Sequence, residues 1–149
     1  MSDLLKIQEV NFETALIEHL QALGYETLLG SDIDRQSDDF RDVFIFDRLE
    51  RAICRINPGI SAKAVALVIQ KISEASGGFD LVERNQAFMQ FLQQGVRVSF
   101  FDGKEQRNEL YKLIDFDHPE SNDFLAVNQW TIHEIETKRP DLVLFINGM

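Results

Sequence analysis

The residue of this chain best placed for metal chemistry is Asp141. Pro140 lacks a backbone donor and suits the first position of a strand, and an almost wholly apolar run follows at Leu142–Ile146. Asp141 is therefore expected at the edge of a sheet, where a divalent metal could reach its carboxylate. The alternative is a carboxylate that only caps or solubilises the start of the strand.

Other residue types that bind metals are present without a matching pattern. The three histidines have no pair at the i, i+4 spacing of metal ligands, and the single cysteine excludes an intramolecular disulfide and a cysteine zinc site. The surroundings of Cys54 predict a buried thiol. The acidic stretch 31–42 lacks the glycine and final glutamate of a calcium loop, which favours a solvated loop. The residues concerned are His19, His118, His133, Asp32, Asp34, Asp38, Asp39 and Asp42.

Length, composition and charge restrict the classes of protein. A chain of 149 residues with 44% hydrophobic residues predicts one globular domain, 1–149. The net charge of −10 excludes a protein that coats nucleic acid through Lys and Arg alone. No apolar stretch approaches the length that spans a bilayer, and the N-terminus does not resemble a signal peptide. We therefore expect a cytoplasmic protein with no membrane partner.

Periodicity predicts helices before strands. Apolar residues recur at helical spacing in 11–23, where Phe12, Leu16, Leu20 and Leu23 form a stripe, and further helices are expected at 43–55, 61–74 and 81–94. After Gly95 the period changes to the alternation of half-buried strands, at 96–100 and again at 124–132. The run 142–146 is typical of a strand covered on both faces. A short strand is also expected at 25–29.

A turn signal follows the last predicted strand. Asn147-Gly148 is the strongest two-residue hairpin signal in the sequence, yet only Met149 comes after it. A hairpin turn without its second strand predicts that this chain is a fragment of a longer protein.

Four stretches, in this order along the chain, resemble the N-terminal nuclease domain of the R (restriction, motor) subunit of type I restriction-modification enzymes. The resemblance covers the chain from about residue 10 to its end. The stretches are the helix from Phe12 to Tyr25, the loop Arg55-Ile56-Asn57-Pro58, the segments Leu113–Phe116, Asn122–Phe124 and Val127–Gln129, and Arg139-Pro140-Asp141 with the strand and turn that follow.

The resemblance implies a nuclease core of the Pro-Asp…(Asp/Glu)-x-Lys type. Asp141 matches the metal-binding aspartate of the strand, and Glu13 matches a glutamate on the first helix that completes the acidic site. Glu18 is the alternative helix carboxylate; Glu13 is preferred because it shares a helical side with Ile17 and Leu20. Carboxylates of this kind would hold Mg²⁺, which activates water and stabilises charge on the phosphodiester.

The sequence departs from the family after Asp141. No Glu-x-Lys follows it, and Glu136-Thr137-Lys138 precedes it, in the wrong order for the family, and is interpreted as solvated charge. No Walker-type phosphate loop is present, so ATP would be bound only by the full-length subunit. The fragment alone is expected to be inactive.

The resulting prediction is an α+β fold with mainly N-terminal helices packed on a mixed β-sheet. It would be a restriction-endonuclease-like core that ends before the Glu-x-Lys strand. In the full complex, with DNA and the modification and specificity subunits as partners, it would contribute to Mg²⁺- and ATP-dependent double-strand DNA cleavage. The rival hypothesis is a non-enzymatic acidic interaction module, either a DNA mimic or an assembly domain.

Overall fold

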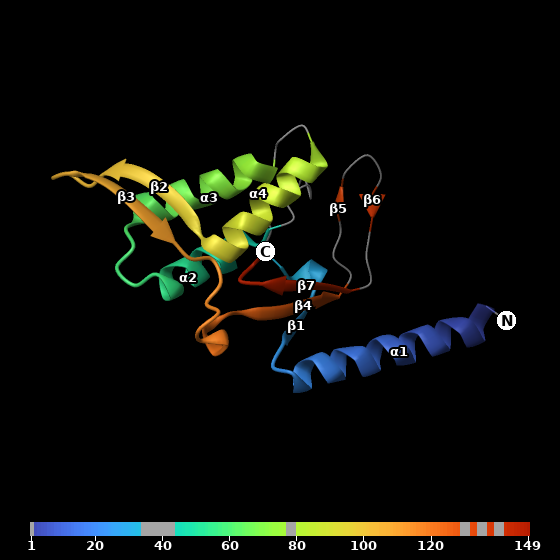
Figure 1. The fold of residues 1–149 in the computed structure, drawn as a ribbon. Coiled ribbons are helices and arrows are strands. Elements are labelled where there is room, and N and C mark those ends of the chain that lie inside the picture. The colour runs from blue at the N-terminus through green and yellow to red at the C-terminus, as the bar shows by residue number, and fades with distance from the viewer. Residues whose placement is uncertain (1, 34–43, 77–79, 129–131, 134–136, 139–141) are drawn as a thin grey trace. The chain divides into compact units, whose positions relative to one another are not determined.

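The computed structural model describes residues 2–33, 44–76, 80–128, 132–133, 137–138 and 142–149 (Figure 1). These residues form two compact units. Unit 1 comprises Met1–Ile45 and Asp123–Met149, and unit 2 comprises Phe46–Asn122.

Unit 1 contains helix α1 (Ser2–Ala22) and a three-stranded sheet in the order β1-β4-β7. Strand β1 (Glu26–Leu29) runs parallel to β4 (Phe124–Asn128), and β7 (Leu142–Ile146) runs antiparallel to β4. The three strands lie side by side in Figure 1. The predicted mixed sheet is therefore confirmed. A separate short pair joins β5 (Ile132–His133) to β6 (Thr137–Lys138).

The burial of β4 and β7 is the reverse of the prediction. Consecutive residues of β4 are buried, so the expected alternation of this strand is wrong. Leu144 of β7 is 48% exposed, so the expectation that this strand is covered on both faces is also wrong. The reason is the order of the sheet: β4 lies in the middle, whereas β7 has a strand on only one side among the described residues. The core of unit 1 consists of Ile45, Leu125, Val127 and Phe145.

Helix α1 begins well before the predicted start and presents a different side inward. Phe12 and Leu23 of the predicted apolar stripe are 73% and 63% exposed, and only Leu20 is buried. The side that carries Glu13, Ile17 and Leu20 is the less exposed one. Most of the predicted apolar stripe is therefore exposed, and Leu20 is its one buried member.

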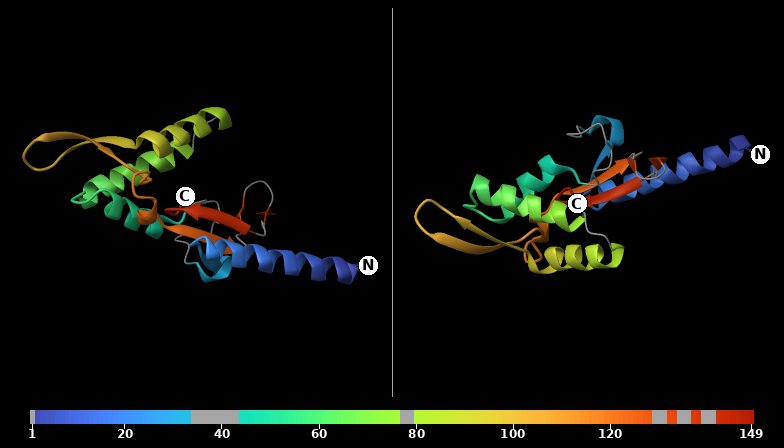
Figure 2. Two further views of the ribbon diagram at one scale, coloured as in Figure 1. Left: turned by 60° about the horizontal axis from the view of Figure 1, so that its bottom comes forward. Right: turned by 90° about the horizontal axis from the view of Figure 1, so that it is seen from above.

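Unit 2 consists of three helices and an antiparallel ribbon (Figure 2). The helices are α2 (Phe46–Ile56), α3 (Ala62–Ser76) and α4 (Leu81–Gln94), close to their predicted bounds, and the ribbon pairs β2 (Val96–Phe101) with β3 (Gln106–Tyr111). Helix α3 packs against α4 and β2. Gly95 ends α4 with a φ of +91°, and a Cβ there would lie 2.6 Å from the Tyr111 carbonyl oxygen, so glycine is required.

The predicted burial of Cys54 is wrong, because the thiol is exposed. The buried side of α2 is formed by Leu49, Ala52 and Ile53, at the i, i+3, i+4 spacing of one helical face. Cys54 follows one residue later, about 100° further around the helix, and so leaves that face.

The described elements give an α+β fold with four helices and mixed sheets. The restriction-endonuclease-like core stays a prediction at this level of detail. The single domain spanning 1–149 also stays a prediction, since compactness of two units does not decide whether they fold separately.

Candidate functional site

The carboxylate of Glu13 is partly withdrawn from solvent on α1. It lies on the helical side of Ile17 and the buried Leu20, whereas Glu18 is exposed on another side. A carboxylate that is to share a metal with a strand must face the body of the unit, and this condition favours Glu13 over Glu18.

Asp141 lies outside the described residues, so its distance from Glu13 is untested. The strand it precedes is described, and Leu142 at the start of β7 pairs with Asn128 at the end of β4. Asn128 in turn pairs with Leu29 at the end of β1. The ends of β1 and β4 and the start of β7 therefore share one end of the sheet.

Asn128 is a candidate that the sequence did not single out for chemistry. Its Oδ1 is buried, and it accepts no hydrogen bond from any residue that the structure describes. An orphaned buried amide oxygen costs free energy unless a water, a proton donor or a cation satisfies it. Asn128 thus adds an oxygen atom that could bind a cation or a water to the sheet end at which β7 begins. Whether this oxygen has a hydrogen-bond donor depends on the residues packed around it in the fold, and the spacing of residues in the sequence does not show these.

The opposite end of β7 is closed by the Asn147-Gly148 turn. Asn147 and Gly148 have φ of 54° and 82°, and Ile146 and Met149 exchange both backbone hydrogen bonds, at 3.0 and 3.1 Å. This is the tight hairpin turn that the sequence predicted. It is an internal turn: Asn147 has no exposed surface, and its Oδ1 accepts the Asp123 N–H at 2.7 Å. The Gly148 carbonyl oxygen accepts the Ile45 N–H at 2.8 Å. These hydrogen bonds therefore fix the backbone of the turn at residues 147–149.

Motif residues in unit 2 hold backbone segments together. The Asn57 Nδ2 donates to the Ile53 and Lys112 carbonyl oxygens at 3.0 and 2.8 Å, and the Asn57 Oδ1 accepts the Lys112 N–H at 2.8 Å. Arg55 Nε donates to the Ser121 carbonyl oxygen at 2.6 Å. Asn57 ties the end of α2 to the chain after β3, so the Asn-Pro loop has a structural role.

Asn122 and Asp115 organise the next turn of unit 2. The Asn122 Oδ1 accepts the Asp115 N–H, and the Asp115 Oδ1 accepts the N–H groups of Asp117 and His118. The Asp115 carboxylate is thereby committed to a turn, and the His118 Nδ1 lies 3.6 Å from its Oδ2. The side chains of Asn122 and Asp115 therefore stabilise a backbone turn, and this is a structural role.

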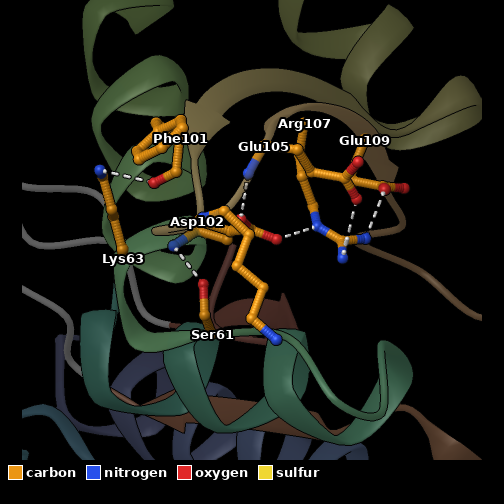
Figure 3. A network of polar contacts seen from close by, with 9 residues as sticks. Ser61, Lys63, Phe101, Asp102, Glu105, Arg107 and Glu109 are labelled. Atoms are coloured by element: carbon orange, nitrogen blue, oxygen red, sulfur yellow. Dashed lines mark hydrogen bonds and ion pairs between the residues drawn. The ribbon is translucent and has the colours of Figure 1, made fainter.

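The tip of the β2–β3 ribbon carries a network of ion pairs, in which Arg107 lies close to Asp102, Glu105 and Glu109 (Figure 3). The Asp102 Oδ1 accepts the N–H groups of Lys104 and Glu105 at 2.8 and 2.9 Å, and its Oδ2 pairs with Arg107 Nε. The hydrogen bond from Arg107, aided by these backbone donors, holds the pKa of Asp102 well below its usual range. The same contact raises the pKa of Arg107.

An open pocket of about 540 Å³ lies beside this tip, between the 58–61 turn and the ribbon. It contains Lys63 and Arg107 together with Asp102 and Glu109. Because Arg107 is paired with Asp102 and lies within ion-pair range of Glu109, the charges of the pocket largely neutralise one another. The arrangement fits a rigid turn better than a binding site for a small ion.

The described part of the chain holds no group of three His, Cys, Asp or Glu side chains that could bind a metal. Glu13 and Asp141 are therefore not shown to meet, and their shared site stays a prediction. None of the described helices is long and apolar enough to cross a membrane.

Comparison with known proteins gives consistent matches. Residues 6–149 match the family model described as the type I restriction enzyme R protein N terminus. The chain is 33% identical over 150 residues to the type I restriction enzyme HindI endonuclease subunit of Haemophilus influenzae, which covers 96% of this chain and 14% of that protein. A Methanocaldococcus jannaschii protein, assigned as the MjaIXP endonuclease subunit of a type I restriction enzyme, is 33% identical over 144 residues, or 92% of this chain and 14% of that protein. No solved structure matches the chain.

Proposed function

The chain belongs to the family of type I restriction enzyme R protein N termini, and from this premise we propose that it is the first part of a nuclease domain. The observation that carries the proposal is the match over residues 6–149, nearly the whole chain. The chain spans 14% of the length of its curated relatives, so the activity belongs to a larger subunit. That subunit would cleave double-stranded DNA with Mg²⁺ and ATP, in a complex with modification and specificity subunits.

The donor set of the proposed site suits Mg²⁺. This ion is commonly held by one or two carboxylates together with waters and substrate phosphates. Glu13 and Asp141 would supply carboxylates, and the unsatisfied buried Oδ1 of Asn128 supports a further polar ligand or a bound water. When bound, the ion would activate a water and stabilise charge on the phosphodiester. Asp141 would hold the ion from the sheet end, and Glu13 would hold it from the helix.

The turn at Asn147-Gly148 supports the location of the remaining catalytic groups. Its two backbone hydrogen bonds reverse the backbone at the end of β7, so a strand that followed in the full-length subunit would run antiparallel to β7. In the full-length subunit, the carboxylate and lysine of the Glu-x-Lys pair would arrive on that strand. The buried Asn147 would keep the strand in register with β7 and therefore with Asp141.

The rival hypothesis, an acidic interaction module, is not favoured. Its support is the net charge of −10, and acidity by itself says nothing of an activity. Both curated relatives are named as endonuclease subunits.

The test is made on the full-length subunit in its complex. Asp141→Ala is expected to lower the rate of plasmid cleavage at least about 100-fold, because a metal-binding carboxylate stabilises the transition state by several kcal/mol. DNA-stimulated ATP hydrolysis is expected to continue, since the motor lies elsewhere in the subunit. Retained cleavage would refute the assignment of Asp141 to the nuclease site. Loss of both activities would point to a role of Asp141 in folding or assembly.

Glu13 and Glu18 provide a matched pair for the helix carboxylate. Glu13→Ala is expected to abolish cleavage and spare the ATPase, whereas Glu18→Ala, with the same change of charge on the same helix, should leave both activities intact. The reverse result would move the helix carboxylate to Glu18. Equal activity of both variants would remove α1 from the site.

A further inference from the structure

The β2–β3 ribbon presents one face entirely to solvent. Val96, Val98 and Phe100 of β2 are buried on the inner face. The opposite face, here called the ribbon face, consists of three cross-strand pairs that are all exposed: Arg97 with Leu110, Ser99 with Asn108, and Phe101 with Gln106. The two apolar members are substantially uncovered, with Phe101 54% and Leu110 47% exposed.

The ribbon face differs in charge from the rest of the chain. It contains no Asp or Glu, although the chain as a whole has 25 of them. Two cations line the outer edge of β2: the Lys71 Nζ donates to the Arg97 carbonyl oxygen at 2.5 Å, and the Lys63 Nζ donates to the Phe101 carbonyl oxygen at 3.1 Å. Both lysines come from α3, eight residues apart, and therefore lie about 12 Å from each other along the helix. Together with Arg97 they form a row of positive charge.

The side chains of the ribbon face suit the groove of a nucleic acid. Arg, Asn, Gln and Ser are the types that hydrogen-bond base edges and phosphates, and an apolar side chain can contact the methyl group of thymine. A two-stranded antiparallel ribbon fits the major groove of duplex DNA, which is about 12 Å wide. Lys63 and Lys71 at its edge would then be near the phosphate backbone that borders the groove.

The ribbon is also held rigid at its tip. The Asp102 carboxylate binds two backbone N–H groups and Arg107, and the Asp102 N–H donates to the Glu105 carbonyl oxygen at 3.1 Å (Figure 3). The Arg107 and Glu109 side chains belong to the inner face, in register with Phe100 and Val98. A preordered ribbon loses little conformational entropy when it docks.

We propose that the ribbon face, flanked by Lys63 and Lys71, is a docking surface for duplex DNA. The choice of DNA as the polyanion rests on the proposed function. The surface belongs to unit 2, whereas the proposed nuclease residues Glu13 and Asp141 belong to unit 1. It would hold the substrate duplex by contacts that take no part in cleavage.

The experiment measures binding by the 149-residue chain of a short fluorescein-labelled duplex, by anisotropy, over a series of low salt concentrations. Three phosphate contacts predict a slope of log affinity against log salt of about −3. Arg97→Gln should weaken binding about 3- to 10-fold at low salt and make the slope less steep by about 1. Ser99→Asp, which adds a negative charge to the face, should weaken binding at least as much.

Arg51→Gln is the matched control. Arg51 is exposed on α2, pairs with Asp47 at 2.9 Å, and loses the same single charge on substitution. Its binding should stay within about twofold of the unchanged chain, because a remote charge contributes only a screened interaction. Circular dichroism confirms that each variant is folded.

Three outcomes would overturn the proposal: no binding of the duplex at any salt concentration, equal losses for Arg97→Gln and Arg51→Gln, or tighter binding of single-stranded than of duplex DNA. The nuclease proposal fails separately. Normal cleavage by the full-length Asp141→Ala subunit would refute the nuclease assignment and leave the binding result standing.

Discussion

Two asparagines, one in each unit, hold the backbone in the same way but in different surroundings. In unit 1, Asn147 has no exposed surface and a φ of 54°, and its Oδ1 accepts the Asp123 N–H. In unit 2, half-buried Asn57 makes three side-chain hydrogen bonds, to Ile53 and Lys112. Water can replace the partners of Asn57 more readily than those of Asn147. We therefore expect burial to weigh heavily in what each asparagine contributes to stability, because a buried group left without its partner is not reached by water.

The largest effect is expected for Asn147→Ala. The substitution leaves the Asp123 N–H without its partner and forces a residue with a Cβ and no local hydrogen bond into the left-handed region. We expect the free energy of unfolding to fall by about 2–4 kcal/mol. Urea denaturation followed by the fluorescence of Trp130, the single tryptophan, measures it in unit 1. Asn147→Gly removes the same side-chain interactions but adopts the left-handed φ without strain, so a loss as large as that of alanine would contradict a contribution from φ.

A smaller effect is expected for Asn57→Ala. Three hydrogen bonds are lost, but solvent reaches the groups they leave, so the free energy of unfolding should fall by about 1–2 kcal/mol. The measurement is urea denaturation followed by helical circular dichroism. If Asn57→Ala lowered the free energy of unfolding more than Asn147→Ala does, the expectation that the buried asparagine contributes more would be wrong.

The same two variants test the prediction of a single domain. If residues 1–149 unfold cooperatively, each substitution shifts the fluorescence and circular dichroism transitions together. If the units unfold separately, Asn147→Ala shifts mainly the fluorescence transition and Asn57→Ala mainly the circular dichroism.

The smallest effect concerns Asp102 and pH. Because Arg107 and two backbone N–H groups lower the pKa of Asp102 in the folded chain, its contribution is fully present above the ordinary pKa of 3.8 and is lost as the pH falls further. At pH 3 the Glu105 amide should still be protected from hydrogen exchange. In Asp102→Asn the protection should be weaker at every pH. A carboxyl that titrates near 3.8 in the folded chain would refute this arrangement.

The two units also differ in charge. Unit 1 contains 5 Lys and Arg against 14 Asp and Glu, a net −9, whereas unit 2 contains 10 against 11, a net −1. The acidity of the chain is therefore a property of unit 1. This is the unit that holds Glu13 and Asp141, the proposed metal ligands, and it would repel DNA in the absence of cations. Unit 2, nearly neutral, can carry a local positive surface such as the ribbon face.

The sequence was sufficient for features governed by local chemistry. Helix α4 with Gly95 after it, the alternation of β2 and the Asn147-Gly148 turn were predicted, because caps, strand period and left-handed turns depend on neighbouring residues. The order of the sheet was not predictable in this way. An apolar run marks a strand, but it does not say whether β4 or β7 lies in the middle. The same limit explains Cys54, whose exposure depends on which side of α2 is covered.

The candidate site was only partly predictable. Pro140 before an apolar strand indicated Asp141, and family resemblance indicated Glu13, which spacing alone does not distinguish from other helical carboxylates. Asn128 was missed because its significance is an unsatisfied oxygen in a buried position, a property of the packed sheet. Asn57 and Asn122 belong to the stretches that carry the resemblance, and in the structure their side chains hold the backbone through hydrogen bonds.

The buried turn after β7 also affects the chemical lifetime of the protein. In an Asn-Gly pair the glycine nitrogen can attack the asparagine side-chain carbonyl with little hindrance, which deamidates the asparagine. Here the Asn147 oxygen accepts the Asp123 N–H, and Asn147 and Gly148 are buried, so the carbonyl is held away from this reaction. Unfolding removes the protection. A new carboxylate at a position with no exposed surface would then oppose refolding, so each excursion to the unfolded state risks becoming permanent.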